Sequence, residues 1–316
     1  MKKILLNRFQ IGHQCALIFL MSLVLNSSQA GQGHGIQMRS GPDRVAVLEL
    51  FSSEGCSSCP PADRWLSSLR KSPGLFRDFI AVEFHVDYWN QLGWTDPFSK
   101  ALFTERQTQM AREWIVPRVY TPAFVLNGGE WAPNSSSLSL TEQLKNEKGA
   151  GILTAQSEAN TPLSFQLTFT PTLGKTGSAT ANVSKDLEQV SYTCHMAILG
   201  NELTQKVPNG ENAGKTLQHD FVVQNYQITK MSQNPNKNIA NLELKLPVNI
   251  NKDSKISVVA WISRGNSPTP IQAVGRDLTL EEVAWIIQTH ENSMNKSTEK
   301  SIERSTQEST NHGSKK

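Results

Sequence analysis

Closely spaced cysteines are scarce in this sequence, and so are internal repeats and long apolar runs. Of the four cysteines in 316 residues, only Cys56 and Cys59 form a close pair. One such pair cannot complete a zinc site, which needs four protein ligands or three with water. We find no internal repeat. Beyond residue 30, no apolar stretch is long enough to cross a bilayer.

The N-terminal segment predicts a secretory signal peptide over residues 1–30. Three basic residues precede an apolar run from Cys15 to Leu25, and small residues before the end at Ala30 fit cleavage after it. No cysteine follows directly, which disfavours a lipoprotein. We therefore expect a secreted or periplasmic chain, whose remaining cysteines meet oxidising conditions.

The chain that follows the predicted signal peptide has no net charge. The signal holds three of the 31 basic residues and none of the 28 acidic ones, so 28 − 28 leaves zero. Nucleic acid and anionic lipid are bound by clustered basic surface, so neither is an expected partner. The remaining length suits two ordinary domains.

The pattern of apolar residues changes near the middle of the chain. After a linker over 31–43, strands alternate with helix-like segments over 44–150, which predicts an α/β domain. Over 158–290 strand follows strand, with alternation such as Leu242 and Leu244 between polar residues. This second pattern predicts a β-sandwich-like domain.

The β-rich domain is expected to end in a helix and to act as a partner or positioning module. Thr279 and Glu282 have the spacing of a capping box at the helix start. The polar tail over 291–316 is expected to be disordered. The loop 210–214 is rich in turn residues and is a candidate contact to the first domain near Cys56.

The strongest chemical signal is the sequence Cys-Ser-Ser-Cys at Cys56 and Cys59. It follows the apolar run 45–51 and precedes a helical pattern that begins near Pro60. Unpaired N–H groups at a helix start stabilise a thiolate, so this is the predicted seat of redox chemistry, with Cys56 attacking and Cys59 resolving. Half of a zinc site and an inert local disulfide have the same pattern.

A second signal lies about sixty residues downstream, at Thr121 and Pro122. A strand pattern follows the proline directly and ends in an Asn-Gly turn. Thioredoxin-like folds start a strand in this way, with a cis-proline that faces the cysteine pair. We therefore predict a cis bond between Thr121 and Pro122, and substrate binding at these two residues.

Several long blocks resemble an uncharacterised secreted family, domain of unknown function 1223, which is grouped with the thioredoxin-like superfamily. The resemblance is carried by LELFSSEGCSSCPPAD at 48–63, FHVDYW at 84–89, LGWTDPF at 92–98 and VYTP at 119–122, and more weakly by GENAGKTL at 210–217. It implies a thioredoxin-like domain over 44–150 and an active site at the cysteine pair. It implies no substrate.

Four further residues are candidates for a proton relay or for the wall of the site. Glu49 interrupts a buried strand pattern, and either relays a proton or is satisfied by backbone or water. His85 and Asp87 share one side of a strand, so His85 is either a catalytic or metal-binding residue or a hydrogen-bond partner of Asp87. Trp89 follows and is expected to wall the thiol site.

Two expectations concern packing. The segment 97–114 is expected to form a helix with Leu102, Met110 and Trp114 in the core. Cys194 lies on the apolar face of an alternating strand and is expected to be a buried hydrophobe rather than a third redox thiol.

Three function classes remain open for this sequence. The first is a thiol–disulfide oxidoreductase or isomerase that acts on exported proteins and is served by a redox partner protein. The second is a non-catalytic binding module in which Cys56–Cys59 is a structural disulfide. The third is a metal site built from both thiolates and His85. The preferred hypothesis is the first, without a cofactor and without a metal ion.

Overall fold

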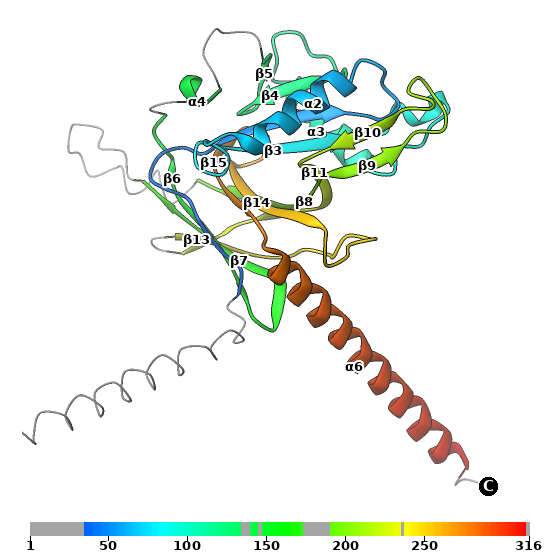
Figure 1. The fold of residues 1–316 in the computed structure, drawn as a ribbon. Helices are drawn as coiled ribbons and strands as arrows, with labels where there is room; N and C mark the ends of the chain where they lie inside the picture. The colour runs from blue at the N-terminus through cyan, green and yellow to red at the C-terminus, as the bar shows by residue number, and fades with distance from the viewer. Residues whose placement is uncertain (1–34, 134–139, 145–146, 173–189, 235–236, 314–316) are drawn as a thin grey trace, which may run out of the picture.

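The computed structural model describes residues 35–133, 140–144, 147–172, 190–234 and 237–313. The predicted signal peptide and Cys15 lie outside these residues. The described chain is a mixed α/β structure made mostly of β-sheet, with a long C-terminal helix (Figure 1).

The largest element of the fold is an eight-stranded sheet with the order β15-β14-β8-β11-β3-β2-β4-β5. Its strands are β2 (Ala46–Ser52), β3 (Phe79–His85), β4 (Ala123–Leu126), β5 (Gly129–Trp131), β8 (Tyr192–Asn201), β11 (Val222–Lys230), β14 (Lys255–Arg264) and β15 (Pro270–Asp277). β2 and β3 are parallel, and all seven residues of each are buried. Parallel strands covered on both faces have continuous apolar runs, which explains the sequence pattern over 45–51.

This sheet crosses the boundary between the two regions that were expected as separate domains. β3 from the first region pairs in parallel with β11 from the second, where Val222 lies opposite Glu83. β11 pairs in turn with β8. The α/β region therefore shares one continuous sheet with the β-rich region, and residues from both are placed around the end of β3.

A second sheet of five strands has the order β1-β6-β7-β13-β12. Its strands are β1 (Gln37–Arg39), β6 (Gly151–Glu158), β7 (Thr161–Pro171), β12 (Ser232–Asn234) and β13 (Lys237–Glu243). β6 alternates buried and less buried residues, as expected for a strand with one covered face. Phe165, Leu167 and Phe169 from this sheet pack in one core with Cys194 and Met196 of β8. Cys194 is thus a buried hydrophobe, as expected.

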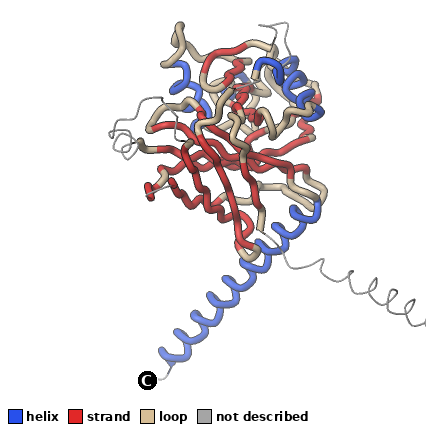
Figure 2. The backbone as a smooth tube through the Cα atoms, turned by 90° about the vertical axis from the view of Figure 1, so that its left-hand side faces the viewer, coloured by secondary structure: helices blue, strands red, loops and turns tan. Residues whose placement is uncertain are grey.

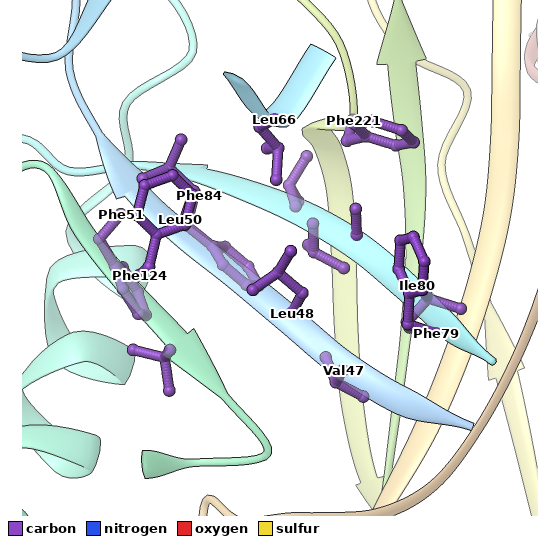
Figure 3. Close-up of a cluster of buried hydrophobic side chains, with 14 of the residues drawn as sticks. Val47, Leu48, Leu50, Phe51, Leu66, Phe79, Ile80, Phe84, Phe124 and Phe221 are labelled. Atoms are coloured by element: carbon purple, nitrogen blue, oxygen red, sulfur yellow. The ribbon is translucent and has the colours of Figure 1, made fainter. Parts of the chain in front are cut away.

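The other core lies around β2 and β3. It is covered by α2 (Pro60–Ser68) and α3 (Ala101–Ala111), which follow the cysteine pair and β3 respectively. Figure 3 shows Leu48 and Leu50 of β2, Phe84 of β3 and Leu66 of α2 within this cluster. Apart from the C-terminal helix, the remaining described elements are the short helices η1 (Leu69–Lys71), η2 (Asn90–Leu92) and α4 (Leu140–Gln143), and a hairpin of β9 (Leu203–Lys206) and β10 (Thr216–His219).

The helix expected over 97–114 is shorter than that range, and the prediction that Leu102 lies in its core is wrong. Met110 and Trp114 are buried, but Leu102 is 41% exposed. α3 begins at Ala101, so Leu102 lies in its first turn, while Phe103 and Met110 face the core.

The C-terminal helix α6 (Leu280–Gly313) starts at the predicted capping box. The Glu282 amide donates to Thr279 Oγ1 and the Thr279 amide donates to Glu282 Oε2, at 3.2 and 2.9 Å. The helix continues through the tail that was expected to be disordered, because no proline or glycine interrupts it before Gly313. Figures 1 and 2 show it projecting away from the sheets. Among the described helices, none is long and apolar enough to span a membrane.

Candidate functional site

Cys56 and Cys59 form a disulfide in the turn between β2 and α2. The Cys59 amide donates to the Cys56 carbonyl, and α2 begins at the next residue, Pro60. Proline is tolerated there because the first N–H groups of a helix have no intrahelical partner. Both cysteines are fully buried, while Ser57 and Ser58 between them are exposed.

Trp89 connects the cysteine loop to the predicted substrate residues. A Cβ atom at Gly55 would lie only 3.1 Å from Trp89 Cβ, so the ring stem packs directly against the cysteine loop. Trp89 Nε1 donates to Thr121 Oγ1 at 2.7 Å. The Thr121–Pro122 peptide bond is cis, as predicted, and β4 starts directly after Pro122. Trp89 therefore lies between the cysteine loop and Thr121.

The loop 210–214 covers the cysteine loop from the β-rich region. Asn212 is fully buried, and its Nδ2 donates to the carbonyl oxygens of Glu54 and Cys56, at 2.8 and 2.9 Å. Next to it, Glu211 Oε2 accepts from the Ser57 amide at 3.0 Å. The expected contact of this loop near Cys56 is thus present, and the β-rich region helps to shape the site.

Directly beside the disulfide loop lies a group of buried acids and histidines, which we call the acid–histidine cluster. Its six members are each at most 2% exposed. They come from the cysteine loop, from α2, from β3, from the loop after η2 and from the end of β10. The members are Glu54, Asp63, Glu83, His85, Asp96 and His219.

His85 bridges two carboxylates of this cluster. Its Nδ1 lies 2.6 Å from Asp96 Oδ2, and its Nε2 lies 3.0 Å from Glu83 Oε1. The Glu54 amide also donates to Asp96 Oδ2, at 2.8 Å. His85 is therefore held at both nitrogens.

His219 faces three carboxylates at longer distances. Its Nε2 lies 3.4 Å from Glu54 Oε1, and its Nδ1 lies 3.6 Å from Glu83 Oε1 and 3.7 Å from Asp63 Oδ2. Both nitrogens lack a hydrogen-bond partner among the described residues, and so do Glu54 Oε1 and Glu83 Oε2. Buried polar atoms are rarely left in this state.

Burial and mutual charge shift the pKa values of these groups in opposite directions. Burial, reinforced by the charge of Glu83, raises the pKa of Asp63 to about 8. Burial also disfavours the charged form of Glu83, but interactions with His219 and His85 outweigh it and lower the pKa of Glu83 to about 2. Burial lowers the pKa of His219, but Glu54 and Glu83 raise it on balance to about 9.

Glu49, one of the candidates for a proton relay, lies on the face of β2 that points away from α2. Its two carboxylate oxygens accept from Arg106 Nε and Nη2 of α3, at 2.6 and 3.0 Å. Ser52, three residues later, instead donates to Asp63 of α2 at 2.6 Å. Alternating residues of a strand point to opposite faces, so the register of Glu49 places it away from α2. It is a buried ion-pair partner.

Arg106 continues this ion pair into a chain of polar side chains, which we call the arginine network. Arg106 Nη1 donates to the hydroxyl of Tyr226, which lies 2.7 Å from His195 Nδ1. His195 Nε2 in turn lies 3.3 Å from Ser263 Oγ. Arg106 also lies over the rings of Phe84, Tyr226 and Trp261.

The expected hydrogen bond between His85 and Asp87 is wrong. Asp87 Oδ1 accepts from Thr104 Oγ1 of α3 at 2.6 Å, while His85 bonds to Asp96 and Glu83. β3 ends at His85, so the alternation of strand side chains does not extend to Asp87. Asp87 therefore lies outside the acid–histidine cluster.

Five members of the cluster were not among the residues selected from the sequence: Glu54, Asp63, Glu83, Asp96 and His219. Glu83 carried a usable signal, because it interrupts the apolar run of β3 in the way that Glu49 interrupts β2. His219 carried none, since it reaches the site only through the pairing of distant strands.

The fold and the site together define a mixed α/β protein in which a Cys-Ser-Ser-Cys disulfide lies beside a buried acid–histidine cluster. Residues 47–263 match the family described as protein of unknown function (DUF1223), and the chain belongs to that family. No curated protein matches this sequence.

Two solved structures are similar to this chain. Protein AGR_C_4864 from Agrobacterium tumefaciens has 22% sequence identity and a TM-score of 0.47, over 75% of this chain and 96% of that one. HBP35 of Porphyromonas gingivalis has 16% identity and a TM-score of 0.49, over 76% of each chain.

Proposed function

We propose that this chain is an exported, thioredoxin-like thiol–disulfide oxidoreductase or isomerase that uses Cys56 and Cys59 on protein substrates. The observation that carries the proposal is the position of the disulfide, which joins a buried strand to the first turn of α2. β3 then runs parallel to β2. A Cys-x-x-Cys pair in a β-α-β unit is typical of thioredoxin-like redox proteins.

The neighbouring strands support the same assignment. β4 pairs antiparallel with β2 and β5 with β4, and Pro122 directly precedes β4. Trp89 links Thr121 to the cysteine loop. We assign Thr121 and Pro122 to the binding of a substrate segment beside the disulfide.

The proposed exchange transfers two electrons between dithiol and disulfide. In the reducing direction, the Cys56 thiolate attacks one sulfur of a substrate disulfide, which forms a mixed disulfide and releases a substrate thiolate. The Cys59 thiolate then attacks the Cys56 sulfur, closes the Cys56–Cys59 bond and releases the second substrate thiolate. A partner protein dithiol returns the pair to the reduced form. The oxidising direction is the reverse.

A second candidate, a non-catalytic module with a structural disulfide, is favoured by one observation. Both cysteines are fully buried, and reactive cysteines are usually accessible. The oxidoreductase proposal therefore requires that the loop 210–214 or the side chain of Trp89 moves before a substrate sulfur reaches Cys56.

The two candidates are distinguished by the reduction potential of Cys56–Cys59, measured on the full chain in glutathione buffers. An exchange protein is expected between about −120 and −270 mV, whereas structural disulfides lie below about −300 mV. The Cys59→Ser variant should trap substrates as mixed disulfides through Cys56. The Cys194→Ala variant serves as the control and should leave the potential unchanged, because Cys194 lies in the other core.

A potential below about −300 mV together with no mixed disulfide in the Cys59→Ser variant would establish the structural role. Better trapping by Cys56→Ser than by Cys59→Ser would reverse the assigned order of attack.

A further inference from the structure

The strongest unexplained feature of the molecule is the ligand-like arrangement within the acid–histidine cluster. Glu83, His85 and His219 each offer one ligand atom, and these atoms all lie within 4.8 Å of one another. The two imidazole rings have centroids 5.1 Å apart and are nearly perpendicular, at 79°. Asp63 Oδ2 lies next to them, 3.7 Å from His219 Nδ1.

We propose that Glu83, His85 and His219 bind one divalent transition-metal ion, with zinc as the best fit, and that Asp63 lies beside this centre. Two imidazoles and one carboxylate form a ligand set that zinc accepts in tetrahedral geometry, with water in the fourth position. This set contains neither cysteine, so the site differs from one built on the thiolates.

The distances between the candidate atoms agree with such a centre. Bonds of about 2.0–2.1 Å at tetrahedral angles place the ligand atoms about 3.3 Å apart. Glu83 Oε1 lies 3.0 Å from His85 Nε2 and 3.6 Å from His219 Nδ1. The contacts of His219 are too long for good hydrogen bonds, but they fit the edges of a tetrahedron around an ion.

The second nitrogen of each histidine also has the environment expected of a metal ligand. Histidines that bind metals usually direct the other ring nitrogen at a carboxylate, which fixes the ring. Asp96 occupies this position for His85, at 2.6 Å from Nδ1. Glu54 occupies it for His219, at 3.4 Å from Nε2. Both rings therefore direct their remaining nitrogen, His85 Nε2 and His219 Nδ1, towards Glu83.

The carboxylates of Asp63 and Glu83 also have oxygens directed towards the histidines. Asp63 uses Oδ1 to accept from Ser52, which leaves Oδ2 directed towards His219. Glu83 Oε2 has no hydrogen-bond partner among the residues the structure describes, and neither ring nitrogen of His219 has one. Buried atoms of this kind call for a missing partner such as an ion.

The charge of the cluster favours a cation. Four carboxylates are buried together with two imidazoles, and the ion pairs found for these acids in the described chain involve only His85 and His219. Burying unbalanced charge costs several kcal/mol per ion unless it is paired. A divalent ion supplies two positive charges at the point that both imidazoles and Glu83 face.

The proposed ion has a structural role. All three ligands are fully buried, so the ion binds inside the protein rather than at an open surface. The ligands lie in β3 and at the end of β10, so binding ties β3 to the β-rich region. Since binding occurs only in the folded chain, it stabilises that chain.

The test uses the full chain, stripped of metal with a chelator and titrated calorimetrically with zinc alone. We expect about one zinc ion per chain and a higher Tm. Substitution with Co²⁺ should give the visible absorption of tetrahedral cobalt. The His219→Gln variant should bind zinc at least about 100-fold more weakly. The matched control, Asp87→Asn, changes a nearby acid outside the cluster and should bind zinc as the wild type does.

Absence of zinc binding by the folded wild-type chain overturns the proposal, and so does equal binding by wild type and His219→Gln. If His219→Gln does not fold, the comparison moves to Asp96→Asn. This variant keeps all three ligands but loses the carboxylate behind His85, so its zinc affinity should fall about 10–100-fold. Unchanged affinity in Asp96→Asn contradicts the assigned ligand orientation.

Discussion

The two faces of strands β2 and β3 carry buried polar groups of opposite character. On the α3 face, the arginine network pairs Glu49 with Arg106 through two hydrogen bonds. On the α2 face, the acid–histidine cluster leaves atoms of Glu54, Glu83 and His219 without hydrogen-bond partners in the described chain. In the first arrangement the carboxylate and the guanidinium satisfy each other, whereas in the second we propose that an added ligand supplies the missing partner.

This difference shows that one pair of strands can place a structural ion pair on one face and a candidate functional site on the other. Because neighbouring residues of a strand point to opposite faces, Glu49 and Ser52 serve different sites although they are three residues apart. A buried carboxylate is therefore informative only together with the face on which it lies. Glu49 resembles a catalytic acid in the sequence, but its charge is already balanced by Arg106.

The largest effect is expected when the cation of the arginine network is removed. Arg106→Leu leaves the Glu49 carboxylate buried without a partner, which should lower the free energy of unfolding by about 3–5 kcal/mol in urea titrations. Changing Glu49 to Leu as well should recover much of this loss, because an apolar pair replaces the ion pair. The exposed Arg112 provides the control, and Arg112→Leu should change stability by less than about 0.5 kcal/mol.

A loss below about 1 kcal/mol for Arg106→Leu, or a double variant less stable than the single one, would show that the network is not closed by this pair.

The second test asks whether sensitivity to metal belongs to one face alone. Zinc at 100 times its Kd should raise the free energy of unfolding of the wild type by about 2.7 kcal/mol. His195→Gln, which alters the arginine network, should keep this gain, whereas His219→Gln should lose it. An equal gain in both variants would place the metal outside the acid–histidine cluster.

A smaller effect is expected at Asn212, in the loop that lies over the cysteine loop. Asn212→Ala removes the donor to the carbonyl oxygens of Glu54 and Cys56, so both are left without this buried partner. The cost should be about 1–3 kcal/mol, with faster reduction of the disulfide by a phosphine because the loop opens more easily. Asn209→Ala, at an exposed position just before this loop, is the control. Identical reduction rates in the two variants would contradict the covering role of Asn212.

The smallest effect is expected far from both faces, at the start of α6. Hydrogen bonds from Arg276 lower the pKa of Glu282, with burial opposing the shift. An acid with a lowered pKa stabilises the fold above its unfolded pKa, and this contribution is lost as pH falls through its folded value. Glu282→Gln should therefore cost about 0.5 kcal/mol at pH 7 and less below about pH 4, as measured by thermal unfolding. A pH-independent difference would exclude the carboxylate charge as its source.

The features that the sequence predicted correctly are those specified by local patterns. The buried runs of β2 and β3, the helix start at Pro60 and the capping box of Thr279 and Glu282 each depend on a few adjacent residues. The cysteine pair also belongs to this class, because its spacing alone brings the sulfurs together.

The features that were missed depend on contacts between distant segments. His219 meets Glu83 because β11 pairs with β3, and no local pattern specifies that pairing. Asp63 gave no signal either, since an acid in a first helical turn is common on the surface. The sheet shared by the two regions was missed for the same reason. A strand pattern shows which residues form a strand, but not which other strand it pairs with.

The pairing of β3 with β11 also has a consequence for the order in which the protein folds. The two strands are separated by the 136 residues between His85 and Val222, so β3 has an unpaired edge until β11 has been made. At about 5–20 residues per second, synthesis of that interval takes roughly ten seconds. An exposed, hydrophobic strand edge is a template for aggregation during that time. A shortened chain that ends before β11 should therefore precipitate rather than accumulate as a smaller stable protein.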